Sequence, residues 1–323
     1  MKTLYIFGNG FDLAQGLSTR YSDFYQYLES KTGSFLLDEM KDSIGSATEL
    51  WSDMEVGLGV FTKFAIGNED FESFYYELSD LLQDYLKHEE YKIIPSKEKY
   101  DKFMNDLENL SDGMEGGDVS RFNEHVFRNF IPSNNISIIT LNYTHTIEKL
   151  IEDFEYDNNI SSDEKLINNI IHLHGELDDT IIIGVDNESQ IAKADFKDDE
   201  AIKDILVKEQ SNFVMKNGNS DRCRRLISEA DIIVLFGVSL GETDARWWKY
   251  IGDILVNRKN TLIIQHVFNP NYKIMRTRRQ QLGKFERDAM DNLLSKLDID
   301  ITELSEIRNR IFFIYNSTAF SRS

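Results

Sequence analysis

Short, uninterrupted runs of β-branched and aromatic residues constrain the fold of this 323-residue chain most strongly. Each run is bounded by Gly, Asn or Asp, and runs of this kind are typical of strands buried on both faces of a parallel sheet. Stretches with helical spacing separate most of them, which predicts an α/β fold with helices on both faces of a mainly parallel sheet. The runs are Leu4–Phe7, Ile136–Leu141, Ile170–Leu173, Thr180–Ile183, Asp231–Phe236, Thr261–His266 and Ile311–Tyr315.

The segment from residue 18 to residue 132 contains no convincing strand. It carries aromatic residues at helical spacing instead, as in Tyr21–Leu28 and Phe71–Leu86, and packing between helices explains such a pattern. We therefore expect residues 18–132 to form a helical insertion after the first strand. Residues 1–17 and 133–323 are expected to form the core of the protein.

The charge balance and the single cysteine exclude several classes of protein. With 36 Lys+Arg against 56 Asp+Glu the formal net charge is -20, which opposes sequence-independent binding to nucleic-acid phosphates. Because Cys223 is the only cysteine, neither an intramolecular disulfide nor a zinc site of three or four thiolates can form. The apolar runs are too short for a membrane span or a signal peptide. These features predict a cytoplasmic protein without a membrane segment.

Glycines and polar residues follow four of the predicted strands. Ligands of open parallel sheets bind at the carboxyl ends of the strands, so we expect these segments to share one cleft. Glycines after the first strand would let the backbone approach a phosphate at a helix start. The third glycine and the acidic residue of a full dinucleotide fingerprint are absent, so a tight turn without a ligand stays an alternative. The four segments are Gly8–Asp12, Asn142–His145, His174–Glu176 and Gly237–Asp244.

Several of these polar residues also have a purely structural explanation. The amide of Asn142 could cap a helix over residues 144–151. His172 and His174 are two positions apart on a predicted strand, where they would share one face and could bind a metal. The sequence places no third ligand beside them, so we expect no metal site.

For two further groups of charged residues, the sequence allows both a structural and a functional role. Asp53 and Glu55 could be catalytic or could form salt bridges within the insertion. Residues 273–287 carry six cationic side chains against one acidic, a net charge of +5. Such a run forms either a solvated face or a surface for a nucleotide or a partner.

The motifs, taken in order, resemble the AbiH family of bacteriophage abortive-infection proteins over nearly the whole chain. This resemblance implies an intracellular effector of phage defence that stops the infected cell. The matching segments are Gly8–Leu17, Tyr21–Phe24, Trp51–Glu55, Leu141–Thr144, His172–Gly175 and Ser239–Asp244.

The same series is similar, more distantly, to the NAD-binding pattern of sirtuins. This resemblance implies a Rossmann-like, sirtuin-like nucleotide-binding core at residues 1–17 and 133–323. It places Asn142 where sirtuins orient the nicotinamide ribose and His174 where they carry the catalytic histidine. It also implies that Phe11 stacks over the nicotinamide and that Ser239 reaches the adenosine ribose. The cofactor-binding residues that it implies are Gly8, Asn9, Gly10, Phe11, Asp12, Thr140, Tyr143, Gly237, Ser239 and Asp244.

Departures from the sirtuin pattern narrow the expected chemistry. Sirtuins that remove acyl groups from proteins usually carry a four-cysteine zinc module, which a chain with only Cys223 cannot build. Thr144 replaces an aspartate that commonly stands there, and the AbiH pattern often has aspartate at the position of His145. The resemblance therefore implies hydrolysis of NAD to nicotinamide and ADP-ribose, with Asn142 holding the ribose and a water and His174 as general base.

Other readings of the same cleft are a nucleotide-sensing module that signals to a partner without turnover, and a hydrolase of another nucleotide. NAD would then be a ligand or would be replaced by a related nucleotide. A phage-derived trigger, a partner protein and a homo-oligomer are all compatible with the sequence. Membrane and nucleic-acid partners are not expected.

Overall fold

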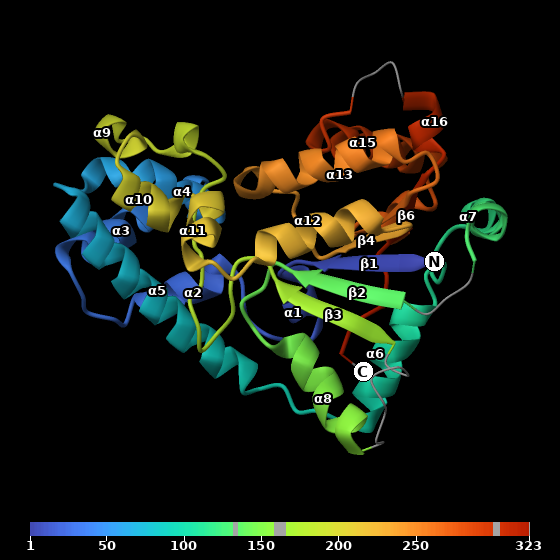
Figure 1. Ribbon diagram of the computed structural model, residues 1–323, viewed down its shortest axis with the longest axis horizontal. Helices are drawn as coiled ribbons and strands as arrows, with labels where there is room; N and C mark the ends of the chain where they lie inside the picture. The colour runs from blue at the N-terminus through green and yellow to red at the C-terminus, as the bar shows by residue number, and fades with distance from the viewer. Residues whose placement is uncertain (132–134, 158–165, 300–303, 323) are drawn as a thin grey trace.

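One parallel sheet organises the protein, whose computed structural model describes residues 1–131, 135–157, 166–299 and 304–322. Six strands lie in the order β3-β2-β1-β4-β5-β6 and every neighbouring pair is parallel, which confirms the predicted α/β fold with a parallel sheet (Figure 1). The strands are β1 (Lys2–Phe7), β2 (Asn135–Thr140), β3 (Ile167–His172), β4 (Ile232–Phe236), β5 (Leu262–Val267) and β6 (Ile311–Tyr315).

Strand β1 has hydrophobic cores on both of its faces. Leu4 and Ile6 belong to one cluster of buried residues, and Tyr5 and Phe7 belong to another, as the two-residue period of a strand requires. Because both faces are covered, the strand needs apolar residues at every position. This double burial explains why the sequence shows uninterrupted apolar runs.

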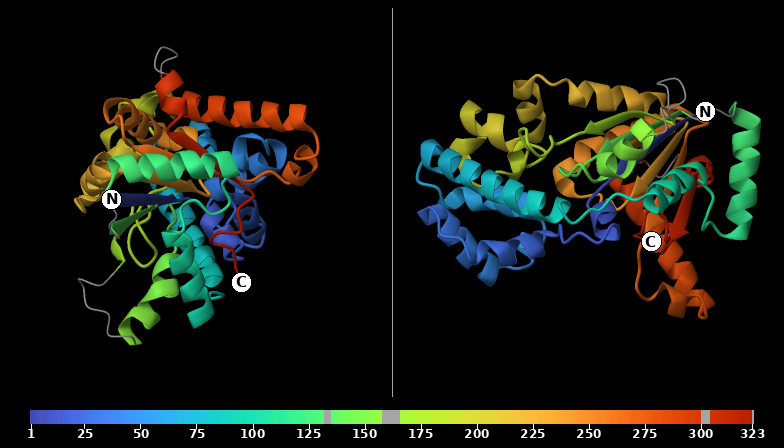
Figure 2. Two further views of the ribbon diagram at one scale, coloured as in Figure 1. Left: turned by 90° about the vertical axis from the view of Figure 1, so that its right-hand side faces the viewer. Right: turned by 90° about the horizontal axis from the view of Figure 1, so that it is seen from below.

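Helices cover both faces of the sheet, and a further group of helices lies beside its carboxyl edge (Figures 1 and 2). The helices that follow β1 are α1 (Gly10–Ala14), α2 (Tyr21–Leu28), α3 (Phe35–Ser46), α4 (Met54–Phe61), α5 (Asn68–Glu90), α6 (Lys97–Glu108) and α7 (Gly116–Asn129). Those after β2 and β3 are α8 (Thr146–Asp157), α9 (Ala194–Lys197), α10 (Glu200–Leu206), α11 (Lys208–Met215) and α12 (Asn219–Glu229). The remaining ones are α13 (Ala245–Asn257), α14 (Tyr272–Met275), α15 (Arg279–Lys296) and α16 (Leu304–Arg308).

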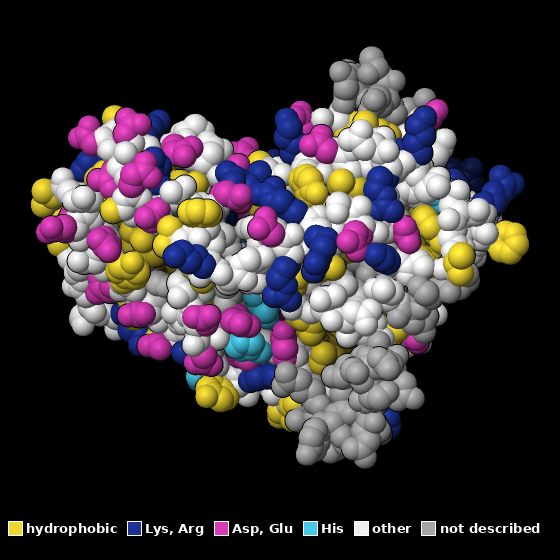
Figure 3. Space-filling view, in the orientation of Figure 1, with side chains coloured by type: hydrophobic (Ala, Val, Ile, Leu, Met, Phe, Trp, Pro, Cys, Tyr) yellow, Lys and Arg dark blue, Asp and Glu magenta, His cyan; other side chains and the backbone are white. Residues whose placement is uncertain are grey.

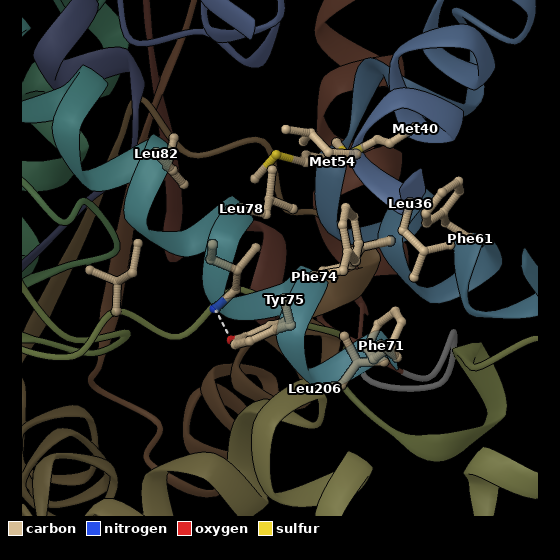
Figure 4. Close-up of a cluster of buried hydrophobic side chains, with 14 of the residues drawn as sticks. Leu36, Met40, Met54, Phe61, Phe71, Phe74, Tyr75, Leu78, Leu82 and Leu206 are labelled. Atoms are coloured by element: carbon tan, nitrogen blue, oxygen red, sulfur yellow. Dashed lines mark hydrogen bonds between the residues drawn. The ribbon is translucent and has the colours of Figure 1, made fainter. Parts of the chain in front are cut away.

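The helices beside the sheet, α2 to α5 and α9 to α11, form what we call the helical layer. Helix α5 carries Phe71, Phe74, Leu78 and Leu82 at helical spacing, and these side chains are buried in one hydrophobic cluster (Figure 4). Leu206 of α10 joins the same cluster. The helical layer is therefore assembled from two stretches of chain, one before β2 and one after β3.

The boundary of the predicted insertion does not coincide with a boundary between hydrophobic cores. Phe103 of α6 and Phe122 of α7 precede residue 132, yet both pack in the cluster that contains Phe7 of the sheet. Residues 132 and 133, where the predicted boundary falls, lie outside the described residues. Among those described between β1 and β2, all regular elements are helical.

The predicted strand at Thr180–Ile183 is wrong. Apart from an isolated antiparallel bridge between Gly175 and Ile181, this segment pairs with no strand. Ile183 is buried in the cluster of the helical layer, and its backbone N–H donates to the Tyr75 hydroxyl at 3.2 Å (dashed line in Figure 4). Its apolar run reflects burial against helices, which periodicity alone does not distinguish from a buried strand.

Two remaining sequence predictions concern membrane-spanning segments and the cationic residues of 273–287. Within the described ranges, no helix has the combination of length and apolar composition that crossing a bilayer needs. The cationic residues of 273–287 lie on and between α14 and α15, where Arg276 reaches the carboxylate of Glu115 at 3.8 Å.

Candidate functional site

The strand ends that precede the four candidate segments are level with one another. Phe7, the last residue of β1, is in register with Thr140 of β2 and with Phe236 of β4, and Thr140 is in register with His172 of β3. The strand order reverses between β1 and β4. Such a reversal opens a crevice at the carboxyl edge of a parallel sheet, which is where these folds bind ligands.

A cavity of about 690 Å³ lies at this edge, between the sheet and the helical layer. Its volume is typical of a site for a small molecule. Most of the residues predicted from the sequence line it, and the helical layer contributes side chains that include Asp53, Glu55 and Lys208. The predicted residues that line the cavity are Gly8, Asn9, Asp12, Asn142, Tyr143, His174, Gly237, Ser239 and Asp244.

Three predicted ligand-binding residues do not line the cavity. The ring of Phe11 is fully buried and lies 4.6 Å from that of Phe7, between centroids, so the predicted stacking over nicotinamide is wrong. Thr140 is also buried, and its hydroxyl accepts a hydrogen bond from the backbone N–H of Asn142 at 3.1 Å. Gly10 is covered by the turn that follows β4.

The glycine turn after β1 binds the turn after β4 rather than presenting free N–H groups. The N–H of Gly8 donates to Phe236 O at 3.0 Å, that of Gly10 to Gly237 O at 2.9 Å, and that of Phe11 to Gly8 O at 2.9 Å. Helix α1 has only five residues, so its dipole is small. The expected phosphate cradle is therefore not formed by these three groups, and the close contact of two turns explains the glycines.

Substitution of Gly10 tests this contact. A Cβ at Gly10 would lie 2.4 Å from the Cα of Gly237, whose φ of +67° also favours glycine. We expect Gly10→Ala to lower the free energy of unfolding by about 1–3 kcal/mol, measured by urea unfolding. Gly117→Ala in α7, where nothing lies within 4 Å, is the control and should be neutral or stabilising. Equal stability of Gly10→Ala and wild type would contradict the contact.

Asn142 and His174 both face the cavity, and neither is used as a helix cap. The amide of Asn142 donates to Gly8 O at 3.2 Å, and α8 begins only at Thr146, so the capping alternative does not apply. His174 is 3 % exposed; its Nε2 lies 2.9 Å from Asp244 Oδ1, and its Nδ1 has no hydrogen-bond partner among the described residues. Burial, followed by the charge of Lys208, lowers the pKa of His174. A neutral imidazole that turns its Nε2–H toward the Asp244 carboxylate keeps the lone pair of Nδ1 to accept a proton.

Behind His174 lies a group of charged side chains that the sequence analysis did not assemble. The ammonium of Lys208 donates to Glu55 Oε2 at 2.8 Å and to Asp244 Oδ1 at 2.9 Å. Asp244 Oδ1 also lies 2.9 Å from His174 Nε2, as a close contact without hydrogen-bond geometry. The hydroxyl of Thr243 donates to Glu55 Oε2 at 2.9 Å. We call Glu55, Lys208, Asp244 and His174 the charged network.

Burial and the charge of Lys208 act in opposite directions on the pKa values of these carboxyl groups. It raises the pKa of Glu55 to about 7, although Lys208 opposes the shift, whereas Lys208 and then His174 hold the pKa of Asp244 below its usual range despite burial. Burial also raises the pKa of Asp12 to about 6; its Oδ2 accepts from the Thr144 hydroxyl at 2.7 Å. Groups that titrate near neutral pH at a cavity wall are typical of functional sites.

Part of this network could have been found from the sequence. Asp53 and Glu55 belong to a motif that was left open, and the structure gives them different roles. Asp53 Oδ1 caps α4 through the backbone N–H of Glu55 at 3.0 Å, whereas the Glu55 carboxylate joins the charged network. No sequence motif around Lys208 marks it as a cavity residue. It lies in a helix, 153 residues away from its partner Glu55.

A second cluster of histidines and carboxylates lies just outside the cavity. His172 Nδ1 contacts Asn142 O at 2.9 Å, and its Nε2 contacts Glu148 Oε1 at 3.1 Å. A carbonyl and a carboxylate both accept, so these two contacts favour the imidazolium form of His172, in which both ring nitrogens carry protons. His145 lies beside it, 5.6 Å away between ring centroids, and Figure 3 shows histidines among acidic side chains on this face. His172 and His174, which are two positions apart in the sequence, therefore lie in different environments: His172 contacts Glu148 outside the cavity, and His174 lines the cavity.

The charge of His172 makes its contribution to stability depend on pH. Burial lowers its pKa, but the hydrogen bond to Glu148 and the charge of Glu148 outweigh burial and raise the pKa overall. A raised pKa means that the stabilisation is complete below the unfolded value of about 6.5 and is lost as pH rises through the folded value. We expect His172→Ala to lower the free energy of unfolding by about 1–3 kcal/mol at pH 6 and by less at pH 9. Urea unfolding of both proteins at the two pH values measures this, and an equal loss at both would contradict the imidazolium.

The fold and the cavity define an α/β protein with a ligand-sized site at the carboxyl edge of a parallel sheet. Among the described residues, no group of three or more His, Cys, Asp or Glu side chains is placed to hold a metal ion. Residues 4–266 match the family model described as "Bacteriophage abortive infection AbiH", and the chain belongs to the AbiH family. No curated protein matches the chain.

Proposed function

We propose that this AbiH protein is an abortive-infection effector that binds NAD in the cavity and hydrolyses it to nicotinamide and ADP-ribose. Membership of the family supports the role in phage defence. The strand order β3-β2-β1-β4-β5-β6 is that of dinucleotide-binding doubly wound folds, which supports a Rossmann-like core. The observation that carries the proposal is that Asn142 and a buried His174, backed by Asp244 at 2.9 Å, line one cavity at the reversal of strand order.

The arrangement supports a simple hydrolysis. Water attacks the anomeric carbon of the nicotinamide ribose, the carbon–nitrogen bond breaks, and its electron pair neutralises the departing nicotinamide. The leaving group therefore needs no proton, and the base has only to take one from the water. His174 accepts that proton, and Asp244, at 2.9 Å, stabilises the imidazolium that forms. Asn142 positions the ribose and the water.

Measurement of nicotinamide tests this function directly. The purified protein is incubated with NAD, with and without lysate of phage-infected cells, and nicotinamide and ADP-ribose are quantified by chromatography. The lysate is included because an effector that stops its own cell needs a trigger. We expect equimolar nicotinamide and ADP-ribose in at least one condition. Intact NAD in both conditions would contradict hydrolysis.

A second candidate function is binding of the nucleotide without turnover. The cavity is lined by the sheet and by the helical layer together, so a ligand in it contacts both parts and its presence could be passed to a partner protein. Tight binding of NAD without release of nicotinamide, in the presence of infected-cell lysate, would favour this function.

A further inference from the structure

The wall of the cavity carries more acidic than basic groups. Asp12, Asp53, Glu55 and Asp244 line it, against the cations of Lys208 and Arg20, and Arg20 is exposed to solvent. Lys208 is 4 % exposed and contacts both Glu55 and Asp244. One ammonium neutralises only one of these carboxylates, so an ionised pair leaves one negative charge without a counter-ion.

This imbalance is costly in the free protein. A charge held away from water and without a partner destabilises the fold, or it takes up a proton. Glu55 follows the second course, because its pKa of about 7 leaves it partly protonated at neutral pH. A ligand that brings a positive charge would replace that proton and complete the pairing.

Aromatic side chains line the same space. Tyr21, Tyr25, Trp51 and Tyr143 all contribute to the cavity wall. Burial, and after it the nearby charge of Glu55, raises the pKa of both Tyr21 and Tyr143, so both phenols stay neutral beside the carboxylate. Aromatic rings next to carboxylates form a favourable environment for an organic cation.

We infer that the acidic and aromatic wall around Glu55 and Asp53 binds an organic cation and discriminates it from a neutral ligand of the same shape. On the proposed function, on which this identification of the ligand rests, the cation is the pyridinium ring of oxidised NAD. Reduced NAD has the same ribose units and phosphates, but its ring is neutral.

Two pairs of ligands that differ in ring charge test the inference. The first pair is oxidised and reduced NAD, and the second is 1-methylnicotinamide, a cation because its ring nitrogen is methylated, and nicotinamide, which is neutral. Binding is measured on the His174→Ala protein, so that turnover does not interfere, by calorimetry for the dinucleotides and by ligand-observed NMR for the ring compounds. We expect the cation of each pair to bind about tenfold more tightly, which corresponds to about 1.4 kcal/mol.

A second substitution removes charge while keeping the helix cap. Asp53→Asn retains a side-chain oxygen for the N–H of Glu55, because asparagine caps helices about as well as aspartate. In the same background it should reduce the preference for the cation severalfold. Asp199→Asn is the matched control, since Asp199 caps α10 through the N–H of Ile202 and does not line the cavity.

The outcomes separate this inference from the proposed function. If the neutral member of each pair binds as tightly as the cation, the inference is overturned, while binding of both dinucleotides still supports an NAD site. If the cationic ring compound is preferred but neither dinucleotide binds, the inference holds and NAD is not the ligand. Failure of all four ligands to bind overturns both.

Discussion

Substitution of His174 by alanine is expected to lower the rate of nicotinamide release by about 10²–10⁴-fold while the protein stays folded. On the proposed mechanism the rate falls because His174 would no longer be there to take the proton from the attacking water. We expect the fold to persist because Nδ1 has no hydrogen-bond partner among the described residues, and because Asp244, which loses its contact with Nε2, keeps its contact with Lys208 at 2.9 Å. Nicotinamide release and the melting temperature, measured on the same preparation, check both parts.

The control for this experiment is His88→Ala. His88 is exposed on α5 and does not line the cavity, so its loss should change neither the rate nor the melting temperature. Full activity of a folded His174→Ala protein would remove the proposed base from the mechanism and shift support to binding without turnover. A protein that unfolds on this substitution would show that His174 has a structural role that its contacts do not reveal.

Substitution of Lys208 by methionine is expected to lower the free energy of unfolding by about 3–5 kcal/mol, because it leaves Glu55 and Asp244 close together without their shared cation. Methionine keeps most of the apolar stem, so the loss reports the charge rather than the packing. Urea unfolding at pH 8, where Glu55 with its pKa of about 7 is mostly ionised, measures it.

Two further variants identify the cause of that loss. Adding Asp244→Asn to Lys208→Met removes one of the uncompensated charges and should recover part of the stability. Lys97→Met is the surface control, since Lys97 pairs with Asp101 on α6, both side chains are more than half exposed, and its loss should cause no measurable change. A Lys208→Met protein as stable as wild type would mean that water or protonation already compensates the carboxylates.

Much of the fold could be predicted because the six strands carry strong local signals. Continuous apolar runs identified every strand of the sheet, and the glycine, asparagine or histidine that directly follows four of these runs placed the candidate residues at its carboxyl edge. The run at Thr180–Ile183 has the same composition but packs on helices. Local sequence alone does not distinguish a strand of the sheet from an apolar segment packed on helices. Phe11 was misplaced for a related reason: its sequence position beside the cavity does not tell which way its ring points.

The residues that line the cavity were predicted on the side of the sheet and missed on the side of the helical layer. Asn142, His174 and Asp244 follow strand ends, so a rule of topology finds them. Lys208 and Glu55 meet only because two distant stretches of chain share one hydrophobic cluster, with Leu206 from one and Met54 from the other. Such a contact depends on tertiary packing, for which a single sequence carries no local pattern.

The two-part origin of the helical layer has a consequence for the ribosome-bound chain. Helices α2 to α5 emerge early, but their apolar side chains lack the partners supplied by residues 177–207 until β3 and α10 have followed. The 153 residues between Glu55 and Lys208 take on the order of ten seconds to translate. During that interval the cavity has no complete wall, so the nascent chain cannot form the cavity before Lys208 and the strand-end residues up to Asp244 have been made.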